Sequence, residues 1–299
     1  MKEAAQKIDS AIGVIAGDIN PDIPTRYIAD AFWEMPIVSD ETLPDIIMGC
    51  QIRNISVVLP TRDGELIFWA KHHSLFKEAG ITIIISNLQA IRRCLDKLAF
   101  AHFGHETGLP MITATDIIDT LNAKAYVVKE RFGSGSRGVA LNLSAEQAHY
   151  YADKLDCPIF QPFINGLEIS IDGWLNCHGQ CLGVVLRRRD KIESGESQIT
   201  TTFSDPVLES QAKQILEKLE LHGPIVMQAI IIDNVMHIIE CNPRFGGAST
   251  TGIAAGLDSL YWSLVEAFGV DNTPIFNRIK SEIKLVRMPI DLVLHDSDI

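Results

Sequence analysis

The residues best suited to chemistry stand together in Glu240–Gly247, which reads E-C-N-P-R-F-G-G. Glu240 and Asn242 are two positions apart at the end of an apolar run, so on an extended strand both side chains leave one face. A carboxylate and an amide oxygen are ligands that a hard cation such as Mg²⁺ accepts. Arg244 follows, and its planar guanidinium suits the clamping of phosphate oxygens. The pattern predicts a metal and phosphate site; the plain alternative is a hairpin that ends in a surface loop.

Two strands must position these residues. The apolar run is interrupted only by Asp233 and Asn234, which predicts a hairpin of strands Ile225–Ile232 and Val235–Cys241. The carboxylate and the amide then stand at the end of the second strand, where a ligand can approach the flexible Gly246-Gly247 turn.

A second segment with chemical potential is the Gly- and Ser-rich loop Gly133–Gly138, which follows a predicted strand at Ala125–Val128 and Lys129. Backbone N–H groups of such a loop can fold over phosphates as a lid. The loop lacks G-K-[ST], so it is not a Walker A motif. Taken alone, it is more often a simple hairpin turn.

The strings E-x-N-P-R-x-G-G and V-K-x-x-x-G-S-G-S-R-G-V together resemble the ATP-grasp superfamily, which includes the carbamoyl-phosphate synthase large chain, biotin carboxylase and carboxylate–amine ligases. The resemblance implies an α/β (α+β) protein with the ATP-grasp fold, in which ATP lies between two α+β halves. It also implies an N-terminal parallel αβ domain of the kind that precedes the ATP-grasp domain in this superfamily. The two halves would meet near residues 161–166.

The resemblance assigns roles residue by residue. The metal ligands, for Mg²⁺ or Mn²⁺, would be Gln228, Glu240 and Asn242. The nucleotide would be bound by Lys97, Lys129, Gly133, Ser134, Gly135, Ser136, Gly138, Gln161, Phe163, Ile164 and Glu168. The catalytic arginines would be Arg244 and at least one of Arg187 and Arg189, between which the sequence does not choose.

The domain organisation follows from the pattern along the chain. Residues 1–92 alternate helix and strand patterns, which indicates a parallel sheet with helices on its faces, and residues 93–299 form the ATP-grasp domain. The chain opens inside what would be the first helix of the family's N-terminal domain. Either the true start lies upstream or the sheet is abbreviated. Within these domains we predict one helix at Asn87–Phe103 and a polar loop at Asp190–Thr202.

Composition excludes several classes of protein. A formal net charge of −12 argues against a nucleic-acid surface, and no apolar run is long enough to span a membrane. The six cysteines are scattered and no signal peptide precedes them, so reduced thiols and a cytoplasmic location are expected. The stretch Cys177–Cys181 could be a metal knuckle, but a hairpin turn at His178-Gly179 is favoured because no second Cys/His pair completes a tetrahedral set.

The predicted function is an ATP-dependent ligase that forms an acyl phosphate from a small-molecule carboxylate, joins it to an amine, and releases ADP and phosphate. One alternative is phosphorylation of bicarbonate or carbamate, as in carbamoyl-phosphate synthase. Another is an ATP-binding pseudoenzyme, suggested by the abbreviated start and the neutral Gln228. A purely structural module would leave the Glu240–Arg244 cluster without a purpose. The residues do not indicate the oligomeric state, and the resemblance makes a homodimer the expected form.

Overall fold

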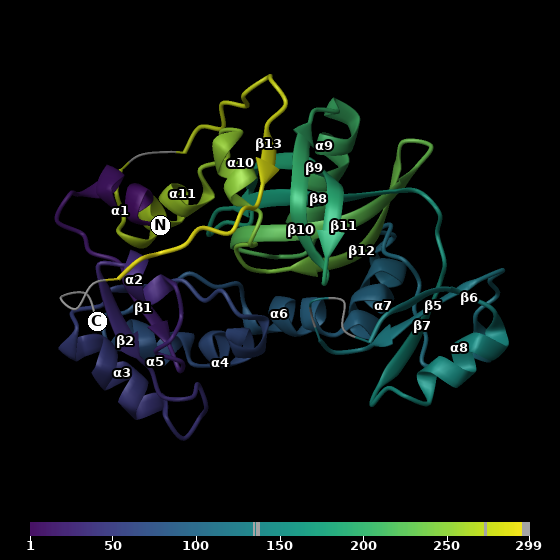
Figure 1. The fold of residues 1–299 in the computed structure, drawn as a ribbon, viewed down its shortest axis with the longest axis horizontal. Coiled ribbons are helices and arrows are strands. Elements are labelled where there is room, and N and C mark those ends of the chain that lie inside the picture. The colour runs from purple at the N-terminus through teal and green to yellow at the C-terminus, as the bar shows by residue number, and fades with distance from the viewer. Residues whose placement is uncertain (134, 136–137, 272–273, 295–299) are drawn as a thin grey trace.

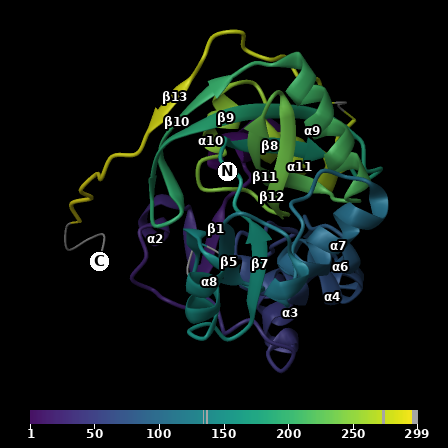
Figure 2. The same cartoon turned by 90° about the vertical axis from the view of Figure 1, so that its right-hand side faces the viewer.

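The computed structural model describes residues 1–133, 135, 138–271 and 274–294. It contains an N-terminal αβ region, a small antiparallel sheet and a large sheet. In Figure 1 the N-terminal region and the small sheet lie at opposite ends of the molecule, and the large sheet lies above them. Figure 2 confirms that the large sheet stands over the small one. The mixed α/β architecture predicted from the sequence is therefore confirmed.

The N-terminal region consists of two parallel strand pairs covered by short helices. The strands are β1 Ile15–Asp18 with β2 Ala31–Glu34, and β3 Val57–Val58 with β4 Thr82–Ile83. The helices are α1 Lys2–Ile8, α2 Thr25–Ile28, α3 Leu43–Ile52, the 3₁₀ turn η1 Asp63–Glu65, α4 Leu66–Lys71 and α5 His73–Glu78. The parallel pairing was predicted, whereas strand β2 was not. The carboxyl ends of β1, β2 and β3 lead into loops whose residues line a pocket.

The small sheet has the order β6-β5-β7 and is antiparallel. Its elements are β5 Tyr126–Glu130, β6 Ala140–Leu143, β7 Pro158–Pro162 and the covering helix α8 Ala145–Ala152. Tyr126, Val128 and Phe160 pack against α8 in one core. Because side chains alternate along a strand, Lys129 and Gln161 must point away from α8, toward the rest of the molecule.

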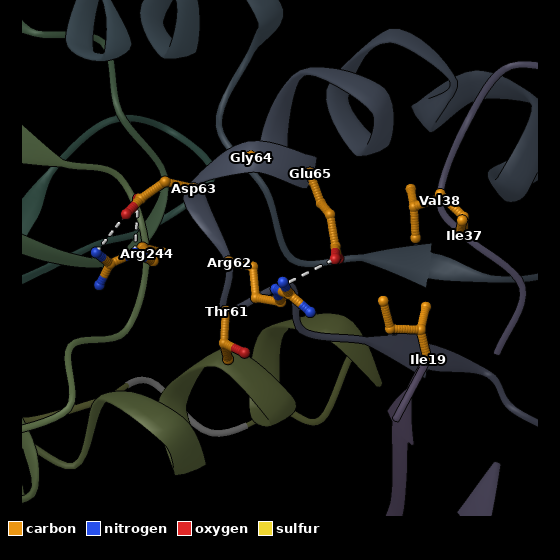
Figure 3. A pocket seen from close by; sticks show the side chains of 9 residues that line it. All are labelled: Ile19, Ile37, Val38, Thr61, Arg62, Asp63, Gly64, Glu65 and Arg244. Atoms are coloured by element: carbon orange, nitrogen blue, oxygen red, sulfur yellow. Dashed lines mark hydrogen bonds and ion pairs between the residues drawn. The ribbon is translucent and has the colours of Figure 1, made fainter. Parts of the chain in front are cut away.

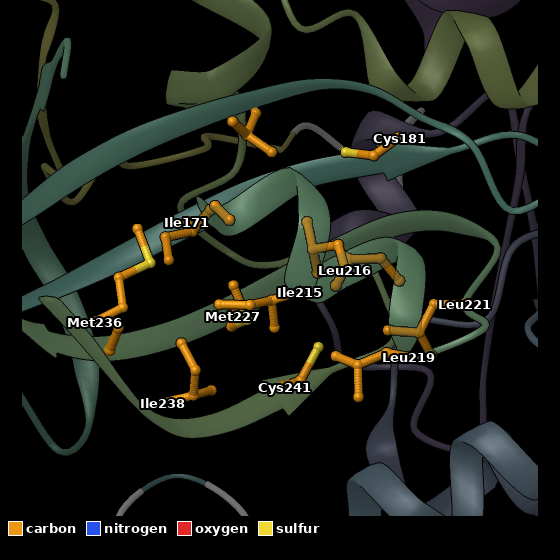
Figure 4. Packing of buried hydrophobic residues seen from close by; sticks show 14 of the residues in the cluster. Ile171, Cys181, Ile215, Leu216, Leu219, Leu221, Met227, Met236, Ile238 and Cys241 are labelled. Carbon is orange, nitrogen blue, oxygen red and sulfur yellow. The ribbon is translucent and has the colours of Figure 1, made fainter. Parts of the chain in front are cut away.

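The large sheet has the order β12-β11-β8-β9-β10-β13. Its strands are β8 Leu167–Leu175, β9 Cys181–Glu193, β10 Glu196–Phe203, β11 Gly223–Ile232, β12 Val235–Asn242 and β13 Lys284–Val286. One face packs on α9 (Pro206–Lys218) through the largest apolar core (Figure 4). The predicted hairpin of β11 and β12 is confirmed, and Asn176–Gln180 is a turn as expected for the cysteine stretch.

The predicted polar loop at Asp190–Thr202 is wrong. β9 and β10 continue through it as a hairpin whose turn, Ser194-Gly195, has φ angles of 50° and 78°. Thr200 and Thr202 are buried on the inner face of β10. The strand is rich in Ser and Thr, and this polar composition concealed it as a loop.

The predicted single helix Asn87–Phe103 is also wrong, because it consists of two helices, α6 (Leu88–Leu95) and α7 (Lys97–Thr107). Asp96 separates them with φ −95° and ψ 100°, and its carboxylate caps α7 by accepting from the backbone N–H of Leu98 and Ala99. The same carboxylate forms a bidentate pair with Arg131, at 2.8 and 2.6 Å. A side chain that satisfies two N–H groups of a new helix stops the previous one.

The remaining segments connect the three parts. After α7 the chain pairs first with β12, where Ile112 N donates to Ile238 O at 2.9 Å, and then with β7, where Thr115 pairs with Phe160. The remaining elements are the 3₁₀ turn η2 Ile118–Thr120 and the helices α10 Thr250–Ala254 and α11 Ser259–Ala267. The predicted boundary at residue 92 falls inside α6, which contributes Ile91 to the N-terminal core and Cys94 to the large-sheet core.

Candidate functional site

On the small sheet, Lys129 and Gln161 share the face that points away from α8. Val127 lies directly opposite Gln161, and Lys129 opposite Ile159, so the two polar side chains belong to neighbouring strands of one face. Gln161 is 4% exposed and its Nε2 donates to Ile112 O at 3.2 Å. This bond leaves the amide oxygen free to accept, which is what recognition of an adenine amino group requires.

Phe163 and Ile164 follow β7 and are half-buried. Phe163 N donates to Ala125 O at 2.8 Å, which ties the segment to the residue before β5 just before the chain enters β8. The structure thus places the predicted hinge residues in the connection between the two sheets.

Lys97 reaches the glycine-rich loop from the first position of α7. Its Nζ donates to Gly133 O at 2.7 Å, and its backbone N–H donates to Arg131 O at 3.2 Å. Gly133, Gly135 and Gly138 have φ values of 128°, 69° and 64°, which are conformations that side chains rarely adopt. Ser134 and Ser136, also predicted to bind the nucleotide, lie outside the described residues.

Both lysines carry shifted pKa values. Burial lowers the pKa of Lys129 from the usual 10.5 to about 8, with the positive charge of Lys97 adding to the shift and the carboxylate of Glu240 opposing it. Burial also lowers the pKa of Lys97, and here Glu240 and Asp63 are the main opposing charges. Two partly desolvated cations near one carboxylate form a site where an added anion would be stabilised.

A bulge in β12 sets the direction of the predicted metal ligands. Gln228 pairs with Glu240 while the next residue of β11 pairs with Ile238, so Ile239 is an extra residue on β12. Before the bulge Ile238 enters the core that faces α9, and after it Cys241 does (Figure 4). Glu240 and Asn242 therefore face the opposite side together, as predicted. Without the extra residue, Glu240 would point into the apolar core.

The oxygen donors on this face differ in how free they are. Asn242 Nδ2 donates to Glu240 Oε1 at 3.1 Å, which leaves the other carboxylate oxygen and the Asn242 amide oxygen available. Gln228 Oε1 already accepts from Arg189 Nη1 at 3.2 Å. Glu240 and Asn242 thus fit an oxygen-ligated cation, whereas Gln228 must first exchange its bond with Arg189.

Arg189 contacts two other predicted residues, Gln228 and Glu168, and also the β9–β10 turn. Its Nη1 also pairs with the carboxylate of Glu168, and its Nη2 donates to Gly195 O at 2.7 Å in the β9–β10 turn. Glu168, predicted to bind ribose hydroxyls, therefore already has a cationic partner. Arg189 can therefore position this carboxylate and the amide of Gln228.

Arg187 is placed elsewhere, with its side chain 2% exposed. It forms a bidentate pair with the equally buried Asp172 at 2.6 and 2.9 Å, and Ser249 Oγ donates to the same carboxylate at 2.7 Å. A Cβ added at Gly252 would lie 2.9 Å from Asp172 Oδ2. This pair holds the turn after Arg244 against β8 and β9. Of the two candidate arginines, only Arg189 lies beside the predicted ligands.

Arg244 reaches the N-terminal region. Its Nε and Nη2 donate to the two carboxylate oxygens of Asp63, each at 2.6 Å (Figure 3). Sequence reasoning missed Asp63. Its signal was the polar stretch Thr61–Glu65 after a short apolar strand, where open α/β sheets bind ligands. The pair connects the predicted catalytic loop to the first domain.

Two families match separate parts of the chain. Residues 156–288 match the family described as ATP-grasp in the biosynthetic pathway with Ter operon, and residues 1–84 match the PylC-like N-terminal domain. A curated relative, carbamoyl-phosphate synthase from Methanobrevibacter smithii, is 30% identical over 129 residues, which is 40% of this chain and 35% of that protein. The chain spans about a third of the length of that relative.

Solved structures share the fold at low sequence identity. The biotin carboxylase domain of Hydrogenobacter thermophilus 2-oxoglutarate carboxylase, solved with MgADP, ADP and bicarbonate, gives a TM-score of 0.73 at 16% identity, over 95% of this chain and 70% of that one. Staphylococcus aureus N5-carboxyaminoimidazole synthetase, complexed with ADP, gives 0.72 at 16% identity, over 96% and 78%. These likenesses show that the chain has the ATP-grasp fold. The match of residues 156–288 to an ATP-grasp family agrees with the superfamily resemblance that the sequence motifs predicted.

The described residues lack two further features. No group of three His, Cys, Asp or Glu side chains that could hold a metal ion occurs among them. In the same part of the chain, no helix combines the length and apolarity needed to cross a membrane.

Proposed function

We propose that the protein is an ATP-dependent carboxylate–amine ligase that releases ADP and phosphate. The observation that carries the proposal is that the carboxylate of Glu240 on the large sheet, which is bonded to Asn242, acts electrostatically on two desolvated lysines from the small-sheet side, Lys97 and Lys129. Cations that face an acidic, oxygen-rich pair across two sheets suit a polyphosphate with its metal ion. The ATP-grasp family match and the ADP complexes of the similar structures support this assignment.

The nucleotide is proposed to lie between the two sheets. The adenine would contact Gln161, Phe163 and Ile164, with the free amide oxygen of Gln161 as acceptor. Lys129 and Lys97 would pair with phosphate oxygens, and the loop Gly133–Gly138 would cover them. Glu240 and Asn242 would hold Mg²⁺, which supplies charge neutralisation to the phosphates when bound.

The chemistry then needs positioning more than covalent help from the protein. A carboxylate oxygen of the substrate attacks the γ-phosphorus, a P–O bond forms to the carboxylate, and the bond to the β,γ-bridging oxygen breaks to release ADP. An amine then attacks the acyl carbon, the C–O bond to phosphate breaks, and phosphate and a proton leave. Arg244 would hold the carboxylate and the developing negative charge, and Arg189 would orient Glu168 and Gln228.

A second candidate is phosphorylation of bicarbonate or carbamate. The 30% match to a carbamoyl-phosphate synthase favours it. Both reactions use the same phosphate and metal residues, so they differ only in the acceptor. A homodimer is a further proposal, supported by the dimer of the similar biotin carboxylase domain, and light scattering tests it.

The experiment is a product analysis. Purified protein is incubated with Mg²⁺ and ATP, with either bicarbonate or pooled amino acids as acceptors, and nucleotides are separated by chromatography. ADP that appears only with amino acids supports the ligase, and ADP that appears only with bicarbonate supports the second candidate. Stoichiometric AMP would contradict both. Tight ATP binding without turnover for any acid would indicate an ATP-binding pseudoenzyme.

A further inference from the structure

A pocket of about 460 Å³ lies at the edge where the parallel strands of the N-terminal region end (Figure 3). Ile19 follows β1, Ile37 and Val38 follow β2, and Thr61–Glu65 follows β3. Arg244 completes the wall from the loop after β12. The volume suits a ligand the size of an amino acid or a dipeptide rather than a macromolecule.

The pocket has three chemically distinct parts in a row. In Figure 3 the apolar side chains of Ile19, Ile37 and Val38 gather on one side, Arg62 and Glu65 lie in the middle, and Arg244 with Asp63 lies on the other side. Ile37 is 69% exposed, so its side chain is open to contact with a ligand. A complementary ligand would carry, in the same order, an apolar group, a charged group and an anionic group that pairs with the guanidinium.

The charged side chains in the middle of the pocket, Arg62 and Glu65, do not form a close ion pair with each other. Arg62 contacts Glu65 and Asp18 only at 3.5 and 3.8 Å, both longer than a good charge-assisted hydrogen bond. Burial raises the pKa of Glu65, and the opposing charge of Arg62 compensates only in part. A ligand ammonium beside Glu65 would supply the missing positive charge.

The guanidinium end adjoins the phosphate residues. Asp63, the partner of Arg244, and Glu240, the predicted metal ligand, both act on the charge of Lys97. Arg244 uses Nε and Nη2 for Asp63, whereas Nη1 has only a 3.3 Å contact to Phe245 O. Arg244 therefore keeps Nη1 as the nitrogen that could donate to a ligand carboxylate at this end of the pocket.

We propose that this pocket binds the acid substrate, and that this substrate is an amino acid with an aliphatic side chain. The inference rests on the proposed ligase function and narrows its substrate class. The substrate carboxylate faces Arg244, its ammonium lies beside Glu65, and its side chain packs on Ile19, Ile37 and Val38. The order of groups in the pocket then matches the order of groups in the substrate.

The test compares two isoleucines of equal exposure in the same region. Ile37→Asn alters the apolar end of the pocket, and Ile52→Asn, at the end of α3 and 70% exposed, is the matched control. ADP release is measured with L- and D-leucine, with glutamate and lysine, and with bicarbonate. We expect leucine to be the best acceptor and Ile37→Asn to raise its KM about tenfold, with no change in Ile52→Asn.

Binding is measured in parallel by calorimetry, with and without ADP and Mg²⁺, so that the two proposals can fail separately. We expect leucine to bind at least about tenfold more tightly than N-acetylleucine or leucinamide, which lack the ammonium or the carboxylate. ADP release with glutamate, lysine or bicarbonate but not with leucine would overturn the substrate class and leave the ligase standing. If no acid gives ADP, the ligase fails; leucine binding that Ile37→Asn weakens would still support the pocket assignment, and absence of binding would overturn it.

Discussion

Replacing Lys129 with methionine separates two effects of this lysine: the destabilisation of the fold by its buried charge and its proposed role in ATP binding. The Lys129 side chain is 5% exposed, and its pKa falls to about 8 from the usual 10.5. At about 1.4 kcal/mol per pKa unit, the buried ammonium destabilises the free protein by about 3 kcal/mol. Methionine keeps most of the aliphatic stem and removes the charge. We expect Lys129→Met to raise the free energy of unfolding at pH 7 by up to about 3 kcal/mol.

The pH dependence has a definite sign. The folded-state pKa of Lys129 lies below the unfolded value, so the penalty is fully present below pH 8 and disappears as the pH rises toward 10.5. The stability difference between variant and wild type must therefore shrink across this window. Urea unfolding at pH 7.0 and pH 9.5 measures it, with Lys124→Met, an exposed lysine just before β5, as the matched control.

The same substitution should weaken ATP binding although it stabilises the fold. If Lys129 pairs with ATP phosphates, Lys129→Met loses at least about tenfold in ATP affinity by calorimetry, because a desolvated phosphate loses its cation. Wild-type affinity should also fall above pH 8 as the free lysine loses its proton, by about tenfold per pH unit. A variant that is less stable than wild type at both pH values and binds ATP normally would refute the reasoning.

Three further predictions follow from the large sheet. Glu240→Gln keeps the fold and much of the nucleotide affinity but lowers turnover by at least about a hundredfold, because the predicted metal-ligand set loses its one carboxylate. Turnover across a Mg²⁺ series and the melting temperature check this, and wild-type turnover would end the metal-ligand assignment. Asn242→Ala is milder in the same assay, since a neutral oxygen is lost, and an equal loss would contradict the charge argument. Arg187→Met lowers the free energy of unfolding by about 3–5 kcal/mol, because Asp172 is left buried without its partner; denaturant unfolding measures this, and a change under about 1 kcal/mol would show that the pair is not structural.

Much of the fold was predictable because its signals are local. The hairpin of β11 and β12 follows from two apolar runs around Asp233-Asn234, and the parallel N-terminal strands follow from alternating patterns. The motif around Glu240 is a local signal as well, and it indicates the ATP-grasp superfamily from the sequence alone. The splitting of the helix at Asp96 was also local in principle, since an aspartate before a new turn is a cap, but its pairing with Arg131 was not visible in the sequence.

What could not be predicted depends on contacts between distant segments. The bulge at Ile239 decides which face Glu240 occupies, and only the pairing with β11 reveals it. The pairing of Arg187 with Asp172, rather than with a substrate, depends on two strands meeting in register. Asp63 lies 181 positions from its partner Arg244, so no pattern along the chain relates them.

The most direct test of the central claim follows oxygen from the acid to phosphate. The protein is incubated with Mg²⁺, ATP and amino acids labelled with ¹⁸O in their carboxyl groups, together with an amine pool, and the released phosphate is analysed by mass spectrometry. We expect ADP and phosphate that carries one ¹⁸O atom, because the carboxylate oxygen attacks the γ-phosphorus and stays with the phosphate. Unlabelled phosphate, or label in AMP, would contradict the acyl-phosphate mechanism.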